Sequence, residues 1–224
     1  MFSARITIIL IIFSGLPGVA LAEFDNESPT VLITGANRGL GLEFTRQYAA
    51  AGWNVIASCR NPDAADELQE IAAANSQIEV AKLDVTSDEE VAVLAERFKD
   101  QPIDVLLNNA GIYGTLEKQT LGSFDYEELK SVFDVNTIGS LRVSQAFLDN
   151  VLASKQKKII SLGGGMGTQS IGRLFGGHYF IKMSKAAHLM GMEQQLRCLP
   201  SDILKQAAKR SESLVAGVRR ATAF

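Results

Sequence analysis

The sequence has few of the residues that build disulfide-rich and zinc-dependent proteins. Its 224 residues include two cysteines, Cys59 and Cys198, and two histidines, His178 and His188. Two cysteines cannot form a disulfide framework, and a zinc centre would be short of its usual ligands. We therefore exclude small disulfide-stapled folds and expect no metal site.

An excess of charge of one sign is missing as well. The chain has 22 Lys and Arg against 25 Asp and Glu, a formal net charge of −3, and it contains no basic block. Because proteins that bind nucleic acids concentrate positive charge against the phosphates, we expect no nucleic-acid partner. Hydrophobic residues make up 46% of the chain, which is enough to bury a core and excludes a disordered protein.

The first 22 residues have the pattern of a secretory signal peptide rather than of a folded segment. Arg5 precedes an uncharged run from Ile6 to Leu21, and residues 20–22 match a signal-peptidase site. The run is shorter than the roughly 20 residues of a membrane-spanning helix. We expect cleavage after Ala22, a periplasmic, luminal or extracellular location, and no transmembrane span in the mature chain. The alternatives are an uncleaved anchor, or a misassigned start in front of a cytoplasmic protein.

After a short lead at residues 23–29, short β-branched or apolar runs alternate with longer stretches of helical period. This alternation predicts βαβ units and a parallel sheet. The expected strands are 30–33, 54–58, 78–83, 103–107 and 159–162, and the expected helices are 40–51, 62–74, 88–98, 126–152 and 179–192. No internal repeat or linker interrupts them. We therefore predict an α/β fold at residues 30–192, a single Rossmann-like doubly wound domain.

Two helix starts carry capping signals. Asn61 precedes Pro62, an N-cap followed by proline at the first helical position. Ser87 stands three residues before Glu90, the spacing of a capping box in which Glu90 bonds the Ser87 backbone N–H.

A glycine-rich loop follows the first strand directly and leads into the first helix. It reads T-G-A-N-R-G-L-G, with glycines that permit a tight turn and a close approach of backbone to pyrophosphate. The helix N-terminus adds unpaired N–H groups and a positive dipole end. The loop therefore predicts dinucleotide binding. The candidate residues are Thr34, Gly35, Asn37, Arg38, Gly39, Leu40 and Gly41.

These motifs resemble those of the short-chain dehydrogenase/reductase family, and most closely its small carbonyl reductases. The loop matches the family's T-G-x-x-x-G-x-G, residues 108–111 match its N-N-A-G, and Asp84-Val85 and Val135-Asn136 match two further motifs. The resemblance implies hydride transfer between a nicotinamide and a small-molecule carbonyl or secondary alcohol. It also implies that the cofactor contacts Asp84, Val85, Asn109, Ala110 and Gly111.

The residues at the end of the second strand decide between the two nicotinamide cofactors. An acidic residue there would bond the ribose 2′-OH of NAD, but this chain has Ser58-Cys59-Arg60. Arg60 and Arg38 could instead bond a 2′-phosphate. We expect NADP rather than NAD, although two solvated surface arginines would leave the choice open.

The catalytic residues of the family are only partly matched. Residues 184–187 match its S-K-A-A, so Lys185 takes the place of the Lys, which the resemblance implies bonds the nicotinamide ribose. Asn136 matches the Asn that supports a proton-relay water. Four residues before Lys185, however, the place of the catalytic Tyr holds Ile181, which has no proton to give. Gly164, or at best Gly163, stands where the catalytic Ser belongs.

Two substitutes for the missing tyrosine stand near this helix. Tyr179 and Lys182 could form a shifted pair, displaced by about 3 Å along the axis and about 200° around it. His178 is the other candidate, but it has no partner that the sequence reveals. Two other hypotheses therefore stand beside the enzyme: a non-catalytic dinucleotide-binding protein, and an inactive reductase shortened by truncation or frameshift.

The resemblance ends near Met192. Residues 193–224 lack the family's Pro-Gly turn and any strand-forming run, and from Ser201-Asp202 they predict one amphipathic helix in a diverged tail. We therefore expect the sheet to lack the family's last strands and to leave the fifth strand at an edge. By resemblance, a homodimer would form through the helices at 126–152 and 179–192.

Overall fold

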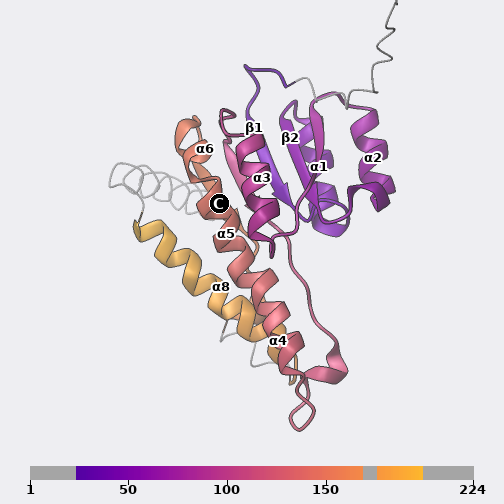
Figure 1. Cartoon of the computed structure of the whole chain (residues 1–224), viewed down its shortest axis with the longest axis vertical. Coiled ribbons are helices and arrows are strands. Elements are labelled where there is room, and N and C mark those ends of the chain that lie inside the picture. The colour runs from indigo at the N-terminus through magenta and orange to yellow at the C-terminus, as the bar shows by residue number, and fades with distance from the viewer. Residues whose placement is uncertain (1–23, 169–175, 199–224) are drawn as a thin grey trace, which may run out of the picture.

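The structure, a computed structural model, describes residues 24–168 and 176–198 (Figure 1). The expected signal peptide and the expected helix from Ser201 lie outside these residues. None of the helices in the described residues has the length and apolar character needed to cross a membrane.

The described strands form one parallel sheet. They are β1 (Thr30–Thr34), β2 (Asn54–Cys59), β3 (Ile78–Lys82), β4 (Val105–Asn108) and β5 (Lys158–Ser161), in the order β3-β2-β1-β4-β5. The prediction of a doubly wound Rossmann-like sheet is confirmed. The chain reverses its winding direction between β1 and β4, and in such sheets a ligand crevice opens at that point, beyond the carboxyl ends of the strands.

Helices cover both faces of this sheet (Figure 1). Alternate residues of β1 point to opposite faces, and Leu32 and Ile33 are fully buried on the two sides. Each such side chain contributes about 1.5–3 kcal/mol through burial. On the Ile33 side lie α1 (Gly39–Ala50) and α2 (Asp66–Ala73), and on the Leu32 side lie α3 (Asp88–Arg97) and α5 (Gly139–Ala146).

The prediction of a helix at 62–74 is wrong for its first residues. A 3₁₀ turn, η1, covers Pro62–Ala64, and α2 starts only at Asp66. Ala65 between them is buried in the core, and its ψ of 59° lies outside the helical region. Asn61 makes no side-chain cap. Burial of Ala65 therefore interrupts a helix that local capping signals alone predicted.

The capping box before α3 is half correct. The Ser87 side chain accepts a hydrogen bond from the Glu90 N–H, as expected. The Glu90 carboxylate instead accepts the Asp84 N–H at 2.7 Å, because the Ser87 N–H already donates to the Asp84 carbonyl. Glu90 thus anchors the loop that carries Asp84 and Val85.

The single helix expected at 126–152 is divided. It consists of α4 (Tyr126–Phe133), a π-helical turn at Asp134–Ile138, α5, and α6 (Leu148–Ala153) after a break at Phe147. Asn136 lies in the π turn. Turns of this kind are frequent at functional sites, because the extra residue redirects side chains that a regular helix would place elsewhere.

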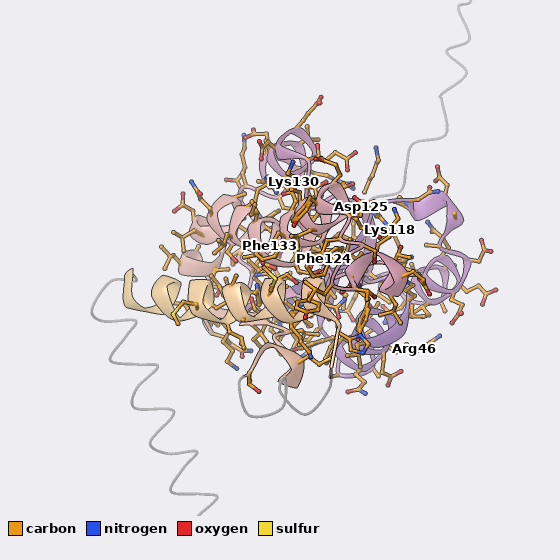
Figure 2. The ribbon with its side chains drawn as sticks, turned by 90° about the horizontal axis from the view of Figure 1, so that it is seen from below. Arg46, Lys118, Phe124, Asp125, Lys130 and Phe133 are labelled. Carbon is orange, nitrogen blue, oxygen red and sulfur yellow. The ribbon has the colours of Figure 1, made fainter. Side chains whose placement is uncertain are left out.

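The last described helix, α8 (Tyr179–Cys198), continues six residues beyond the expected end at Met192 and packs against α4. Figure 2 shows Phe124 and Phe133 beside it. Before α8 lie the 3₁₀ turns η2 (Leu116–Gln119) and η4 (Gly165–Gly167). Within the described residues β5 forms an edge of the sheet, and its Ile160 is exposed.

Candidate functional site

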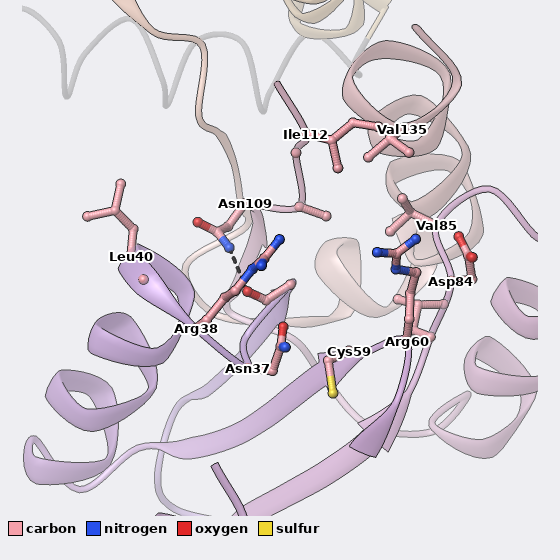
Figure 3. A pocket seen from close by; sticks show the side chains of 15 residues that line it. Asn37, Arg38, Leu40, Cys59, Arg60, Asp84, Val85, Asn109, Ile112 and Val135 are labelled. Atoms are coloured by element: carbon pink, nitrogen blue, oxygen red, sulfur yellow. Dashed lines mark hydrogen bonds between the residues drawn. The ribbon is translucent and has the colours of Figure 1, made fainter. Parts of the chain in front are cut away.

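The carboxyl ends of the central strands open on a cavity of about 380 Å³ (Figure 3). This volume lies within the range of small-molecule sites. Most of the predicted cofactor residues line it: Gly35, Asn37, Arg38, Gly39, Leu40, Arg60, Asp84, Val85, Asn109, Ala110 and Gly111. The sequence analysis missed four further lining residues, namely Cys59, Leu83, Ile112 and Val135. Each of these four residues adjoins a residue of a predicted motif, and this adjacency was the only sequence signal that could have identified it.

The glycine loop has the geometry that its sequence implies. Gly35 and Gly39 have φ values of +67° and +56°, in the left-handed region that glycine tolerates. A Cβ atom on Gly41 would lie 2.2 Å from the Gly35 carbonyl oxygen. The first turn of α1 has neither a side-chain cap nor an acidic residue. Its unpaired N–H groups and positive dipole end therefore suit a bound anion.

Two predicted cofactor residues, Thr34 and Gly41, do not line the cavity but shape the loop. The Thr34 hydroxyl accepts the N–H groups of Asn109 and Ala110 at 3.0 Å each. The Asn109 side chain donates to the carbonyls of Thr34 and Gly35, at 2.8 and 3.0 Å. These bonds hold the glycine loop against the N-N-A-G segment after β4.

Arg38 and Arg60 both line the cavity, as expected (Figure 3). The ion pairs in the described residues engage other arginines, Arg46, Arg97 and Arg142. The guanidinium groups of Arg38 and Arg60 thus have no carboxylate partner within the described residues. An anionic group that entered the cavity would find two exposed cations with which to form charge-assisted hydrogen bonds.

Lys185 and Asn136 meet near Gly111, at the end of the cavity. A Cβ atom on Gly111 would lie 3.6 Å from Lys185 Nζ and 3.3 Å from Asn136 Oδ1. Lys185 donates to the Leu162 carbonyl at 2.6 Å, and its burial lowers the pKa of its ammonium group. It does not line the mapped cavity, where the resemblance had placed it with the cofactor residues.

The Asn136 side chain is buried and fully used as a donor. It donates to the Ile112 carbonyl and to Ser184 Oγ, and it accepts the Ile112 N–H at 2.8 Å. On the side chain of Asn136, a relay water could therefore bind only the second lone pair of Oδ1. The observed contacts give Asn136 a clear structural role, which is to hold the segment after β4 against α8.

The residues that the sequence places at the family's Ser and Tyr positions, Gly164 or Gly163 and Ile181, have no hydroxyl. Ile181 is buried in the core. Gly164 has a φ of +103°, so a serine there would be strained, and a Cβ atom on Gly163 would lie 2.5 Å from Leu189 Cδ2. The nearby Ser161 hydroxyl donates to Met192 Sδ. A serine at Gly163 would require the Leu189 side chain to move, and a serine at Gly164 would hold a strained backbone.

The two substitutes have different surroundings. Tyr179 packs edge-to-face against Phe124, with the ring centroids 5.0 Å apart, which fits a packing role. His178 does have a partner, contrary to the expectation from sequence: its Nδ1 lies 2.8 Å from the Tyr113 hydroxyl. Sequence reasoning missed Tyr113 because no local pattern connects residues so far apart.

Comparisons with known proteins show the family to which this chain belongs. A family model described as short chain dehydrogenase matches residues 29–194. Very-long-chain 3-oxoacyl-CoA reductase of Coccidioides immitis is 30% identical over 153 residues, which cover 66% of this chain and 44% of that protein. Retinol dehydrogenase 8 of Bos taurus is 34% identical over 149 residues, which cover 63% and 46%. This chain therefore spans less than half the length of these two relatives.

The fold has a similar solved structure. It is the NADPH-bound carbonyl reductase from chicken fatty liver, which is 30% identical, with a TM-score of 0.70. The match covers 76% of this chain and 73% of that one.

Proposed function

Because this chain belongs to the short-chain dehydrogenase family, we propose that it is an NADP-dependent oxidoreductase acting on a small carbonyl compound or secondary alcohol. The observation that carries the proposal is the cavity that joins the uncapped start of α1 to Arg38 and Arg60. The similar reductase from chicken fatty liver, which is NADPH-bound, supports the choice of cofactor.

The residues of the cavity fit the two ends of NADP. The glycine loop offers backbone N–H groups to a pyrophosphate, and the lack of a side chain at Gly41 lets α1 pack against Gly35 and Asn109. Arg60 and Arg38 would bond the 2′-phosphate. A charge-assisted hydrogen bond contributes about 1.5–3 kcal/mol, which is sufficient to select NADP over NAD.

At the other end, Lys185 is suited to orient a nicotinamide ribose. Its ammonium group is held by the Leu162 carbonyl and retains donors for ribose hydroxyls. When bound, the reduced cofactor would supply the hydride. The protein would exclude water, fix the orientation of the reactants and supply a proton to the carbonyl oxygen.

The cofactor choice is tested by calorimetry with NADPH and NADH on the wild type and on Arg60→Glu. We expect Arg60→Glu to weaken NADPH binding about 10- to 100-fold through the lost bond and the new repulsion, and not to weaken NADH binding, because a glutamate at this place can bond the ribose 2′-OH. Arg46→Glu is the matched control, because Arg46 is exposed and lies outside the cavity. Preference of the wild type for NADH, or absence of NADPH binding by a folded chain, would refute the proposal.

A second candidate function is a non-catalytic dinucleotide-binding protein. The observation that favours it is the buried Ile181, together with the left-handed Gly164, at the two places where the family carries hydroxyls. Such a protein would bind NADPH as proposed above and would leave every carbonyl compound unreduced. Turnover therefore distinguishes the two functions, whereas cofactor binding does not.

Assembly and location also remain proposals. A homodimer through α4 and α8 is supported by their exposed apolar side chains, which include Tyr126, Met183 and Met190. A monomeric mass in sedimentation would refute it. Entry into the secretory pathway rests on residues 1–22 alone and is tested by N-terminal sequencing of the protein from its native host.

A further inference from the structure

Tyr113 and His178 form a polar pair beside the candidate site. The Tyr113 hydroxyl lies 2.8 Å from His178 Nδ1 and 3.7 Å from Met166 Sδ, and the two rings meet edge-to-face. Three separate segments supply these residues: the stretch after β4, the turn η4 after β5, and the residue before α8. Tyr113 is 41% exposed, so its phenol is accessible to a ligand.

Two of these segments, the stretch after β4 and the turn η4, adjoin the end of the site where Lys185 lies. Gly111 and Ile112, directly before Tyr113, line the cavity. Gly167, directly after Met166, packs so closely on Lys185 that a Cβ atom on it would lie 2.9 Å from the Lys185 Cβ. Tyr113 is not itself among the residues that line the cavity, but its segment and Met166, which its hydroxyl approaches, both adjoin the Lys185 end and not the end with the two arginines.

The backbone at His178 is strained. Its φ is +57°, a left-handed value that is unfavourable for a residue with a Cβ atom. Its carbonyl nevertheless accepts the Lys182 N–H and so starts α8. Strain of this kind persists where the surroundings hold the residue in place, and it is concentrated at functional sites.

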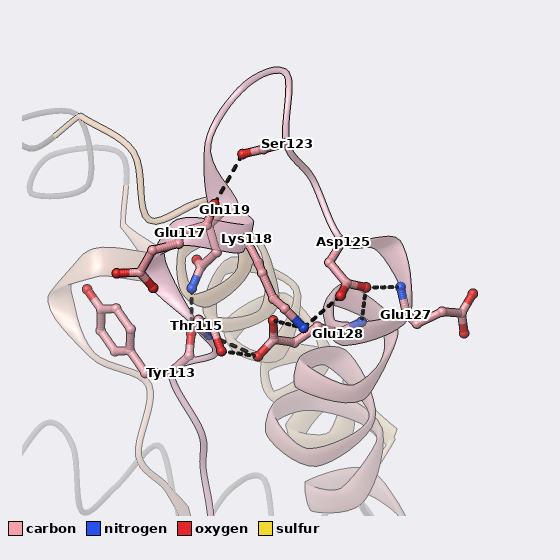
Figure 4. Close-up of polar contacts among 9 residues, drawn as sticks. All are labelled: Tyr113, Thr115, Glu117, Lys118, Gln119, Ser123, Asp125, Glu127 and Glu128. Carbon is pink, nitrogen blue, oxygen red and sulfur yellow. Dashed lines mark hydrogen bonds and ion pairs between the residues drawn. The ribbon is translucent and has the colours of Figure 1, made fainter.

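A buried glutamine connects the backbones that carry the pair. Gln119 is 1% exposed, and its side chain donates to the Tyr113 carbonyl at 3.0 Å and accepts the Phe180 N–H at 2.9 Å. Figure 4 shows Gln119 close to Tyr113, in a segment that Lys118 joins to Asp125 at the start of α4. The phenol and the imidazole are thus positioned by the interior of the protein.

We propose that Tyr113, paired with His178, supplies the proton that Ile181 cannot supply. In reduction, the carbonyl carbon accepts the hydride, the C=O electron pair moves to the oxygen, and that oxygen takes the proton of the Tyr113 hydroxyl. His178 Nδ1–H then returns a proton to the phenolate while Nε2 takes one from water, which leaves hydroxide to the solvent, and exchange of the ring proton with solvent restores the Nδ1–H form. Oxidation of the alcohol follows the same steps in reverse. This inference rests on the proposed function.

The test measures NADPH oxidation by the purified protein with benzaldehyde, acetophenone and menadione, and NADPH binding by calorimetry. We expect Tyr113→Phe to lower kcat by about 100-fold or more, which is the usual effect of losing a general acid, with NADPH affinity unchanged. Tyr126→Phe is the matched control, because Tyr126 is an exposed tyrosine on α4 for which we expect an unchanged kcat.

A second variant separates proton relay from simple positioning. His178→Asn keeps a residue that tolerates the left-handed backbone and can still bond the phenol, but an amide cannot pass a proton from one ring nitrogen to the other as an imidazole can. We expect its kcat to fall about 10-fold or more, with an unchanged KM, because the phenolate would regain its proton more slowly. Circular dichroism and a melting curve verify that both variants fold.

Three results would overturn the inference. The first is full activity of Tyr113→Phe. The second is an equal loss of activity in Tyr179→Phe, which would favour the hypothesis that Tyr179 and Lys182 form the catalytic pair. The third is no turnover of any of the three compounds by a protein that binds NADPH. The last result would favour the non-catalytic function. Failure of a folded protein to bind NADPH would instead refute the proposed function itself.

Discussion

Replacing Gly41 with alanine is expected to abolish NADPH binding and to destabilise the fold. The new Cβ atom would lie 2.2 Å from the Gly35 carbonyl oxygen and 2.6 Å from Asn109 Nδ2. Neither atom can move without breaking the bonds between the glycine loop and the segment after β4. We expect the free energy of unfolding to fall by about 2–4 kcal/mol and NADPH affinity to fall by about 100-fold or more.

Gly52→Ala provides the matched control at the opposite end of α1. Gly52 also has a positive φ, +76°, but a Cβ atom there meets no other atom within 4 Å, and Gly52 lies outside the cavity. The expected cost is about 1 kcal/mol of backbone strain, with unchanged NADPH affinity. Urea unfolding and calorimetry measure both quantities. Equal effects of the two substitutions on NADPH binding would contradict the role assigned to Gly41.

The stability of the protein is expected to fall in mild acid because of His188. Its side chain is 2% exposed, and neither ring nitrogen has a hydrogen-bond partner among the residues that the structure describes. Burial, and secondarily the charge of Lys185, lower its pKa from 6.5 to about 4. At a pH between the two pKa values, the unfolded chain binds more protons at this position than the folded protein does. The free energy of unfolding therefore falls as the pH falls from 6.5 toward 4, by roughly 3 kcal/mol in total.

His188→Leu is expected to remove this pH dependence and to stabilise the protein. At neutral pH the gain should be about 1–3 kcal/mol, the cost of leaving a buried polar group unsatisfied. Below pH 6 the advantage of the variant should increase further. Urea unfolding of both proteins across this pH range measures the difference. A constant gap between the two stability curves would contradict the assignment of the acid sensitivity to His188.

Local patterns in the sequence determined the secondary structure and the framework of the candidate site. The alternation of strands and helices predicted the parallel sheet, and the loop from Thr34 to Gly41 predicted a cavity-lining turn at its carboxyl edge. Both predictions depend only on residues that are close in sequence, because strand period, helix period and the tolerance of glycine for positive φ are local properties. For the same reason the absence of a hydroxyl at Ile181 was evident before the structure.

Only the tertiary structure decided the features that depend on distant parts of the chain. Burial of Ala65 interrupts an expected helix, Glu90 bonds Asp84 because the Ser87 N–H is already engaged, and a π turn holds Asn136. The pairing of Tyr113 with His178 joins residues 65 positions apart. Such contacts arise when loops close over the ends of the strands, and no period or motif within either segment encodes them. The sequence by itself therefore predicted the residues of a dinucleotide site, and the tertiary structure alone brought a phenol and an imidazole together beside the cavity that most of them line.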